Sequence, residues 1–173
     1  MKRQQHRSQE DSAWKDVLDA FFHPFMTFFF PAVANHIDWS LGFEALDKEL
    51  QKITSKAFVG KRFVDKLFKV TLFSGERQWI LLHVEVQSYP QKEFAKRMYV
   101  YNYKLFDLYN LPVLPLVILA DEHPTWRPTK YVHTIAGKTV LSFHFDMVKL
   151  LDYTSKRPLL AEEQHQVFAV VVS

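Results

Sequence analysis

Three residues on two neighbouring predicted strands have the types and the spacing for metal-ion chemistry. Glu85 and Gln87 lie two positions apart in the alternating run 78–87, so both belong to the same face of one strand. From position 80 onward the other face of that strand carries only isoleucine, leucine and valine, and we expect it to pack inward. Asp65 lies near the start of the preceding predicted strand, 63–73.

The turn between these strands brings the acidic residues together. A turn at 74–76 makes the strands a hairpin and puts residue 65 roughly across from residue 86 or 87. Two carboxylates close together repel, and either a divalent cation or a raised pKa relieves that repulsion. Mg²⁺ is the natural ion, because these residues offer only oxygen ligands. The alternative interpretation is a pair of ordinary surface acids, paired with Lys66 or Lys69.

The N-terminal part of the chain is predicted to be a tail followed by two helices. Residues 1–12 are polar, and we expect a disordered tail there. Apolar residues recur at helical spacing over 13–30, and Pro24 should end or kink that helix. Residues 41–53 have an apolar stripe typical of an amphipathic helix, with Ser40 as its N-cap.

Beyond the hairpin, the pattern predicts a helix followed by a buried strand. Residues 91–109 have apolar positions with a period near 3.6, which indicates a helix. The continuous apolar run 113–120 is typical of a strand covered on both faces, although Pro115 keeps its early part from pairing fully. Residues 131–136 and 138–145 are weaker strand predictions. A helix that joins an antiparallel pair to a further strand indicates a layered α/β fold.

Composition limits the class of protein. The 173 residues, 48% apolar and 24% charged, fit one globular domain over 13–173. The net charge of +3 permits nucleic-acid binding without demanding it. The chain has no cysteine, which excludes disulfides and thiolate metal sites and suits a cytoplasmic location. The most apolar segment, 21–31, contains His23 and Pro24 and is too short to span a bilayer, so we expect core packing there and no membrane partner.

Four features of the chain, taken together, resemble one family of nucleases. They are Asp65, the tripeptide Glu85-Val86-Gln87, the helical segment Arg97-Met98-Tyr99-Val100-Tyr101, and the buried run Leu114-Pro115-Leu116-Val117-Ile118-Leu119. In this order they resemble the recombination-promoting nuclease (transposase) family of the PD-(D/E)XK superfamily, over residues 14–173. In that family the aspartate and an E-x-Q tripeptide occupy the two strands of a hairpin.

The resemblance implies a fold and an activity. The fold would be a restriction-endonuclease-like PD-(D/E)XK core, with a mixed sheet flanked by helices and the acidic cluster at one sheet edge. The activity would be Mg²⁺-dependent hydrolysis of phosphodiester bonds in duplex DNA during recombination or transposition. Asp65 and Glu85 would be the metal ligands. Because cleavage of both strands needs two active sites, the resemblance also favours a homodimer.

Further site residues follow from the resemblance. Gln87 occupies the position where most of the superfamily has a lysine, and an amide can orient water or phosphate but supplies no positive charge. Lys69, which shares the strand parity of the aspartate, and Arg97, on the following helix, are the candidates for that charge, and Arg97 is preferred. Superfamily members often add an acidic ligand from the first core helix, for which Glu49 is preferred over Glu44.

Two other functions stay open at this point. A catalytically inactive member would bind nucleic acid or a partner through the same fold, and the missing lysine favours it. The apolar run 167–173 lies where relatives continue with further helical sequence, so we expect a shortened C-terminus, which also favours the inactive alternative. The third alternative is a small structural domain with no role in nucleic-acid chemistry.

Overall fold

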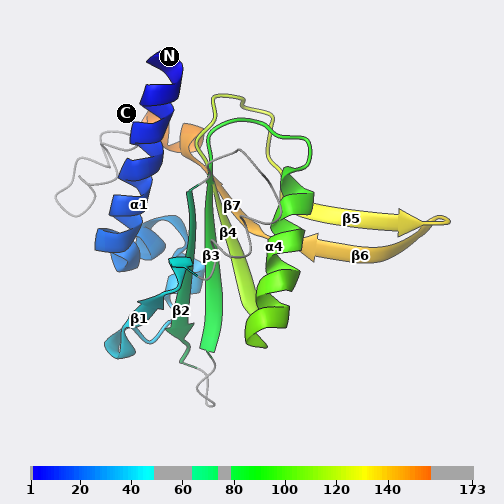
Figure 1. Ribbon diagram of the computed structural model, residues 1–173, viewed down its shortest axis with the longest axis horizontal. Helices are drawn as coiled ribbons and strands as arrows, with labels where there is room; N and C mark the ends of the chain where they lie inside the picture. Colours follow the sequence, from blue (N-terminus) through cyan, green and yellow to red (C-terminus); the bar gives the residue numbers. More distant parts are fainter. Residues whose placement is uncertain (1, 49–63, 74–78, 157–173) are drawn as a thin grey trace.

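A five-stranded mixed sheet organises the chain, with a helix on each of its faces (Figure 1). The computed structural model describes residues 2–48, 64–73 and 79–156. The strand order is β1-β2-β3-β4-β7; the first two pairings are antiparallel and the last two parallel. The strands span Phe43–Ala45 (β1), Val64–Thr71 (β2), Trp79–Gln87 (β3), Val113–Leu119 (β4) and Asp146–Lys149 (β7). The protein is therefore a mixed α/β protein, as the sequence predicted.

The first helix, α1, runs from Lys2 to Phe29 and is longer than the sequence predicted. Residues 2–12, for which we predicted a disordered tail, are helical, and that prediction is wrong. The glutamines, lysine, arginines and glutamate of this stretch are good helix formers, which explains the extension. Pro24 lies inside the helix, and the backbone departs from helical angles at Phe21 (φ −130°, ψ 31°). The predicted kink is thus confirmed, because proline disturbs the turn that precedes it.

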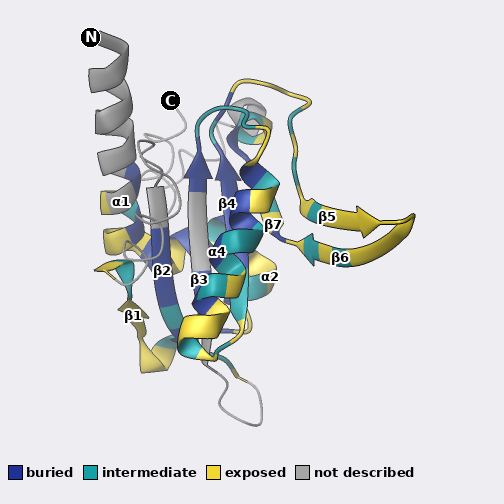
Figure 2. Ribbon diagram, turned by 45° about the vertical axis from the view of Figure 1, so that its right-hand side comes forward, coloured by how far each residue is buried: buried dark blue, intermediate teal, exposed yellow. Residues whose placement is uncertain are grey.

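The phenylalanine-rich end of α1 forms the larger core of the protein. Phe22, Phe25 and Phe29 are buried against the face of the sheet that α1 covers (Figure 2). Phe22 stacks on Phe68 of β2 with ring centroids 3.8 Å apart. Core packing is therefore the role of this segment, which continues into the short helix α2 (Pro31–Ala34). Within the described ranges, no helix combines the length and the apolarity that crossing a bilayer requires.

The predicted helix over 41–53 is wrong for residues 41–46; residues 47–48 are helical, and the rest of the range lies outside the described residues. A single 3-10 turn, η1 (Trp39–Leu41), is capped by Asp38, and the edge strand β1 follows it. Gly42, with φ +70°, ends the turn in a conformation that favours glycine, so a helix cannot run through it. Pairing with β2 then overrides the helical pattern of this segment.

Helix α4 (Phe94–Tyr109) connects β3 to β4 and covers the second face of the sheet. Its apolar side packs on two places, Phe94 and Met98 against Val117 and Leu119 of β4, and Leu105 against Leu67 of β2. Asn110 ends the helix in the left-handed conformation that asparagine tolerates. The predictions for β2, β3, α4 and β4 are confirmed within a few residues.

The last described elements include a two-stranded ribbon, which the sequence predicted, and a fifth strand of the main sheet, which it did not predict. Strands β5 (Lys130–Ile135) and β6 (Lys138–His144) form a separate two-stranded sheet, which confirms the two weaker strand predictions. After Phe145 the chain returns to the main sheet as β7 and continues into the 3-10 segment η2 (Leu150–Lys156). β7 pairs with β4 only from Leu116 onward, after Pro115, as expected for a proline within a strand.

Candidate functional site

Asp65 and Glu85 are direct partners in the antiparallel pairing of β2 with β3. The sequence placed residue 65 across from residue 86 or 87, and the observed register corrects this by one or two positions. The difference matters, because a slip of one residue moves a position to the other face of the sheet. Directly paired positions share a face and have Cα atoms about 4.5–5.5 Å apart. The backbone therefore puts both acidic positions at one spot on one face.

That face is the one covered by α4. Position 67 of β2 has the same parity as Asp65, and Leu67 packs on Leu105 of α4. Gln87 has the same parity as Glu85, and its side chain also meets α4. The side chains of Asp65 and Glu85 lie outside the described part of the structure, which gives their backbone positions. Two oxygen-donor residues in direct register on one face fit a hard divalent cation.

Gln87 and Arg97 form a buried polar pair beside these positions. Gln87 lies at the end of β3 and is fully buried, and Arg97 in the first turn of α4 is only 2% exposed. Nη2 of Arg97 donates a hydrogen bond of 2.8 Å to Oε1 of Gln87, and Nη1 donates to Oε1 of Gln91. Nε2 of Gln87 in turn donates to the carbonyl of Tyr89 at 2.6 Å. Gln87 thereby holds a buried positive charge in a fixed orientation.

The other predicted sources of charge lie elsewhere. Lys69 shares the face of Asp65, but it is four residues along β2, roughly 13 Å away at a typical strand rise. Its ammonium lies 3.6 Å from the carboxylate of Glu44 on β1. Glu44, the less favoured candidate for a third ligand, is thus at the edge of the sheet and away from Asp65. Glu49, the preferred candidate, lies outside the described residues.

A buried ion pair that the sequence did not predict lies on the same side of the sheet. Nζ of Lys149 donates to both carboxylate oxygens of Asp121 at 2.7 Å, and both side chains are almost fully buried. Lys149 pairs with Leu119 in the register of β4 and β7, and Leu119 pairs with Gln87. Asp121 also accepts the backbone N–H of His123. The pair therefore anchors the loop after β4 to the sheet.

The sequence could have indicated one member of this pair, because Asp121 directly follows a predicted buried strand. The carboxyl ends of parallel strands are where polar groups of α/β proteins gather. Lys149 could not be predicted as its partner, because the strand that carries it, β7, was not predicted. Across 2–48, 64–73 and 79–156, no three histidine, aspartate or glutamate side chains whose placement is described gather as a metal site.

A second buried lysine lies on the opposite, α1-covered face. Nζ of Lys66 lies 2.6 Å from Asp19 of α1 and 2.5 Å from Asp47. Burial alone would lower the pKa of Lys66, but the hydrogen bonds to Asp19 and Asp47 outweigh it and raise the pKa above its usual value. The ammonium group of Lys66 is consequently engaged with Asp19 and Asp47, on the face opposite to the one that carries position 65.

Comparison of the chain with protein-family models, with curated protein sequences and with solved structures finds no match. The sheet order and the placement of the helices show a mixed α/β fold.

Proposed function

We propose that this protein is a Mg²⁺-dependent DNA endonuclease with a PD-(D/E)XK type of core, related to the recombination-promoting nucleases. The observation that carries the proposal is the direct register of Asp65 and Glu85 on the face of the sheet that α4 covers. The antiparallel hairpin, the crossover through α4 and the parallel strand β4 come in the order that the resemblance implies.

Asp65 and Glu85 would hold the Mg²⁺ ion through their carboxylates. Bound there, the ion would supply charge neutralisation for the phosphate oxygens of the scissile bond and favour hydrolysis by water. Paired carboxylates suit this role because the cation removes the repulsion between them. Cleavage of both strands of a duplex would require two copies of the chain.

Arg97 would supply the positive charge that the superfamily places on a lysine. Because Arg97 is 2% exposed and is bound to Gln87 and Gln91, it would act as a fixed charge beneath the site rather than as a contact to DNA. Gln87 would then be a positioning residue, since both ends of its amide are engaged within the protein. Its neutral side chain accepts the hydrogen bond that a lysine could not accept.

Nicking of supercoiled plasmid in Mg²⁺ tests the proposal. We expect nicking by the wild type, loss of nicking in EDTA, and at least a hundredfold loss in Asp65→Ala and Glu85→Ala. Glu44→Ala is the matched control, because it removes a carboxylate from the same sheet at a position away from Asp65. Nicking that persists at the wild-type rate in Asp65→Ala and Glu85→Ala would refute the assigned site.

A second candidate function is nucleic-acid binding without catalysis. The glutamine at position 87 favours this alternative, because the usual superfamily position then has no lysine amine. The amide of Gln87 is instead bonded to Arg97. This alternative predicts salt-sensitive binding of duplex DNA with no nicking in Mg²⁺ or Mn²⁺. The same plasmid assay, combined with a binding titration, separates the two candidates.

A further inference from the structure

The β5–β6 ribbon projects from the body of the protein into solvent (Figure 1). Ala136 and Gly137 both have positive φ, which makes a tight two-residue turn between Ile135 and Lys138. From Tyr131 to this turn the ribbon reaches roughly 13–15 Å at a typical strand rise. An isolated two-stranded ribbon is marginally stable in water. Its stability must therefore come from its base or from something it binds.

The base of the ribbon is fixed to the α4 side of the sheet. Tyr131 stacks on Tyr99 of α4 with ring centroids 5.5 Å apart, and Phe143 meets the same ring edge-on at 5.6 Å. Phe143 also packs with the apolar cluster of α4 and β4. Tyr99 is two residues from Arg97 in the sequence. The ribbon thus leaves the body on the same side of the sheet as the candidate site.

Beyond this base, the ribbon is exposed and carries no negative charge. Val132, Ile135 and Val140 are 41%, 56% and 56% exposed. No aspartate or glutamate occurs over 123–145, whereas the ribbon contains two lysines and two histidines, at Lys130, His133, Lys138 and His144. The register puts Lys130, Val132, Thr134, Thr139, Ser142 and His144 on one face, and His133, Ile135, Lys138 and Leu141 on the other. Each face therefore has basic side chains that suit contacts to phosphates.

We propose that the β5–β6 ribbon is an arm that enters a groove of duplex DNA. This inference rests on the proposed function, since it names how the substrate of the same site is held. A two-stranded ribbon fits the width of the major groove, which is about 8.5 Å deep and so within reach of the exposed part. The basic side chains complement the phosphates that line the groove. The apolar side chains near the tip can contact thymine methyl groups.

The features of the ribbon argue against a second copy of the chain as its occupant. The register shifts between His133 and Thr134, so Val140 has no partner in the ladder and the strands form a bulge. Bulges and lysines on an edge are the devices by which proteins prevent strand-to-strand association. In a dimer through this ribbon, the lysines of the two copies would also meet with the same sign of charge.

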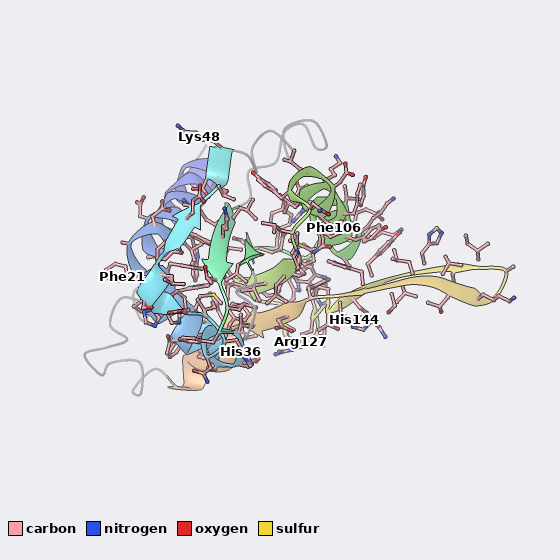
Figure 3. All side chains as sticks on the ribbon, turned by 90° about the horizontal axis from the view of Figure 1, so that it is seen from below. Phe21, His36, Lys48, Phe106, Arg127 and His144 are labelled. Carbon is pink, nitrogen blue, oxygen red and sulfur yellow. The ribbon has the colours of Figure 1, made fainter. Side chains whose placement is uncertain are left out.

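A binding titration with two ribbon variants tests the inference. The first, Lys138→Gln, removes one charge at the exposed tip. The second replaces residues 134–140 by Asn-Gly, which closes the existing His133–Leu141 pair with a two-residue turn. Lys48→Gln is the charge-matched control, because Lys48 is exposed and lies far from the ribbon (Figure 3). Affinity for a 30-base-pair duplex is measured by fluorescence anisotropy in EDTA over a series of salt concentrations.

We expect Lys138→Gln to weaken binding by about 5- to 10-fold at 0.1 M salt and to reduce the salt slope by about 0.9, the value for one lost phosphate contact. The shortened ribbon should lose at least as much, while Lys48→Gln should bind as the wild type does. Wild-type affinity and slope in both ribbon variants would overturn the inference. So would a shortened ribbon that abolishes a wild-type dimer, measured by light scattering, without changing DNA affinity.

The two proposals fail in different ways. If the wild type binds DNA but does not nick plasmid in Mg²⁺, the endonuclease proposal fails, and weakened binding by the ribbon variants still supports the arm. If the wild type nicks plasmid and both ribbon variants bind and nick equally well, the arm is refuted and the endonuclease stands.

Discussion

Restoring the lysine of the superfamily at position 87 should destabilise this protein rather than improve it. In the wild type, Oε1 of Gln87 accepts a 2.8 Å hydrogen bond from Arg97, and both side chains are buried. Gln87→Lys puts an ammonium where that acceptor was, next to a guanidinium that stays protonated. The change therefore removes a hydrogen bond and creates a buried pair of like charges.

The size of the effect follows from these contacts. Loss of a hydrogen bond to a charged group costs about 1.5–3 kcal/mol. Two positive charges about 4 Å apart repel by roughly 4 kcal/mol at an effective dielectric constant of 20. The introduced lysine can avoid this repulsion by releasing its proton, which costs about 4.6 kcal/mol at pH 7 for a reference pKa of about 10.4. Together with the lost hydrogen bond, both routes predict a total loss of roughly 5.5–7.5 kcal/mol at neutral pH, comparable to the whole stability of many domains.

The pH dependence distinguishes charge repulsion from a simple misfit. In the variant, the unfolded chain holds the proton of the introduced lysine and the folded chain disfavours it, so raising the pH favours folding. Between pH 7 and pH 9 the variant should therefore regain up to about 2.7 kcal/mol relative to the wild type. Urea unfolding, followed by circular dichroism at several pH values, measures this difference.

Two controls complete the experiment. Gln87→Leu removes the hydrogen bond without adding charge and should cost only about 1.5–3 kcal/mol, with no pH dependence of its own. The double variant Gln87→Lys, Arg97→Gln exchanges the two groups and should recover most of the loss. A Gln87→Lys variant as stable as the wild type at pH 7 would refute the description of Arg97 as a buried charge held by Gln87.

Two further predictions concern the other buried lysines. Lys149→Met should destabilise the protein by about 3–5 kcal/mol in urea unfolding, because Asp121 is left as a buried charge without its counter-ion. The double variant Lys149→Met, Asp121→Leu should be closer to the wild type in stability. Equal losses in the single and double variants would contradict this. Lys66→Met should cost about 1–3 kcal/mol at pH 7 through its lost bonds to Asp19 and Asp47. Since the folded pKa of Lys66 is raised, the wild-type advantage should be complete below pH 10.5 and shrink above it; a constant difference up to pH 12 would exclude this linkage.

The parts of the fold with a strong local pattern were predictable from the sequence. The alternation of β3, the period of α4 and the continuous apolar run of β4 each reflect a periodicity that burial imposes. The pairing of Asp65 with Glu85 followed approximately from the position of the turn, and the remaining error of one or two residues came from the unknown centre of that turn.

The parts decided by tertiary contacts were not predictable. Residues 43–45 fit a helical stripe, but pairing with β2 makes them an edge strand. β7 has only four residues and too little pattern to be recognised, so the ion pair between Lys149 and Asp121 could not be expected. The bond between Gln87 and Arg97 links two elements whose relative placement only the folded structure gives.

Binding of Mn²⁺, measured by electron paramagnetic resonance, tests the shared-cation site most directly. Mn²⁺ is a suitable probe because it accepts the same hard oxygen ligands as Mg²⁺. We expect one site in the wild type, at least a tenfold loss of affinity in Asp65→Asn and in Glu85→Gln, and no change in Glu44→Gln. Wild-type affinity for Mn²⁺ in the double variant Asp65→Asn, Glu85→Gln would contradict the account.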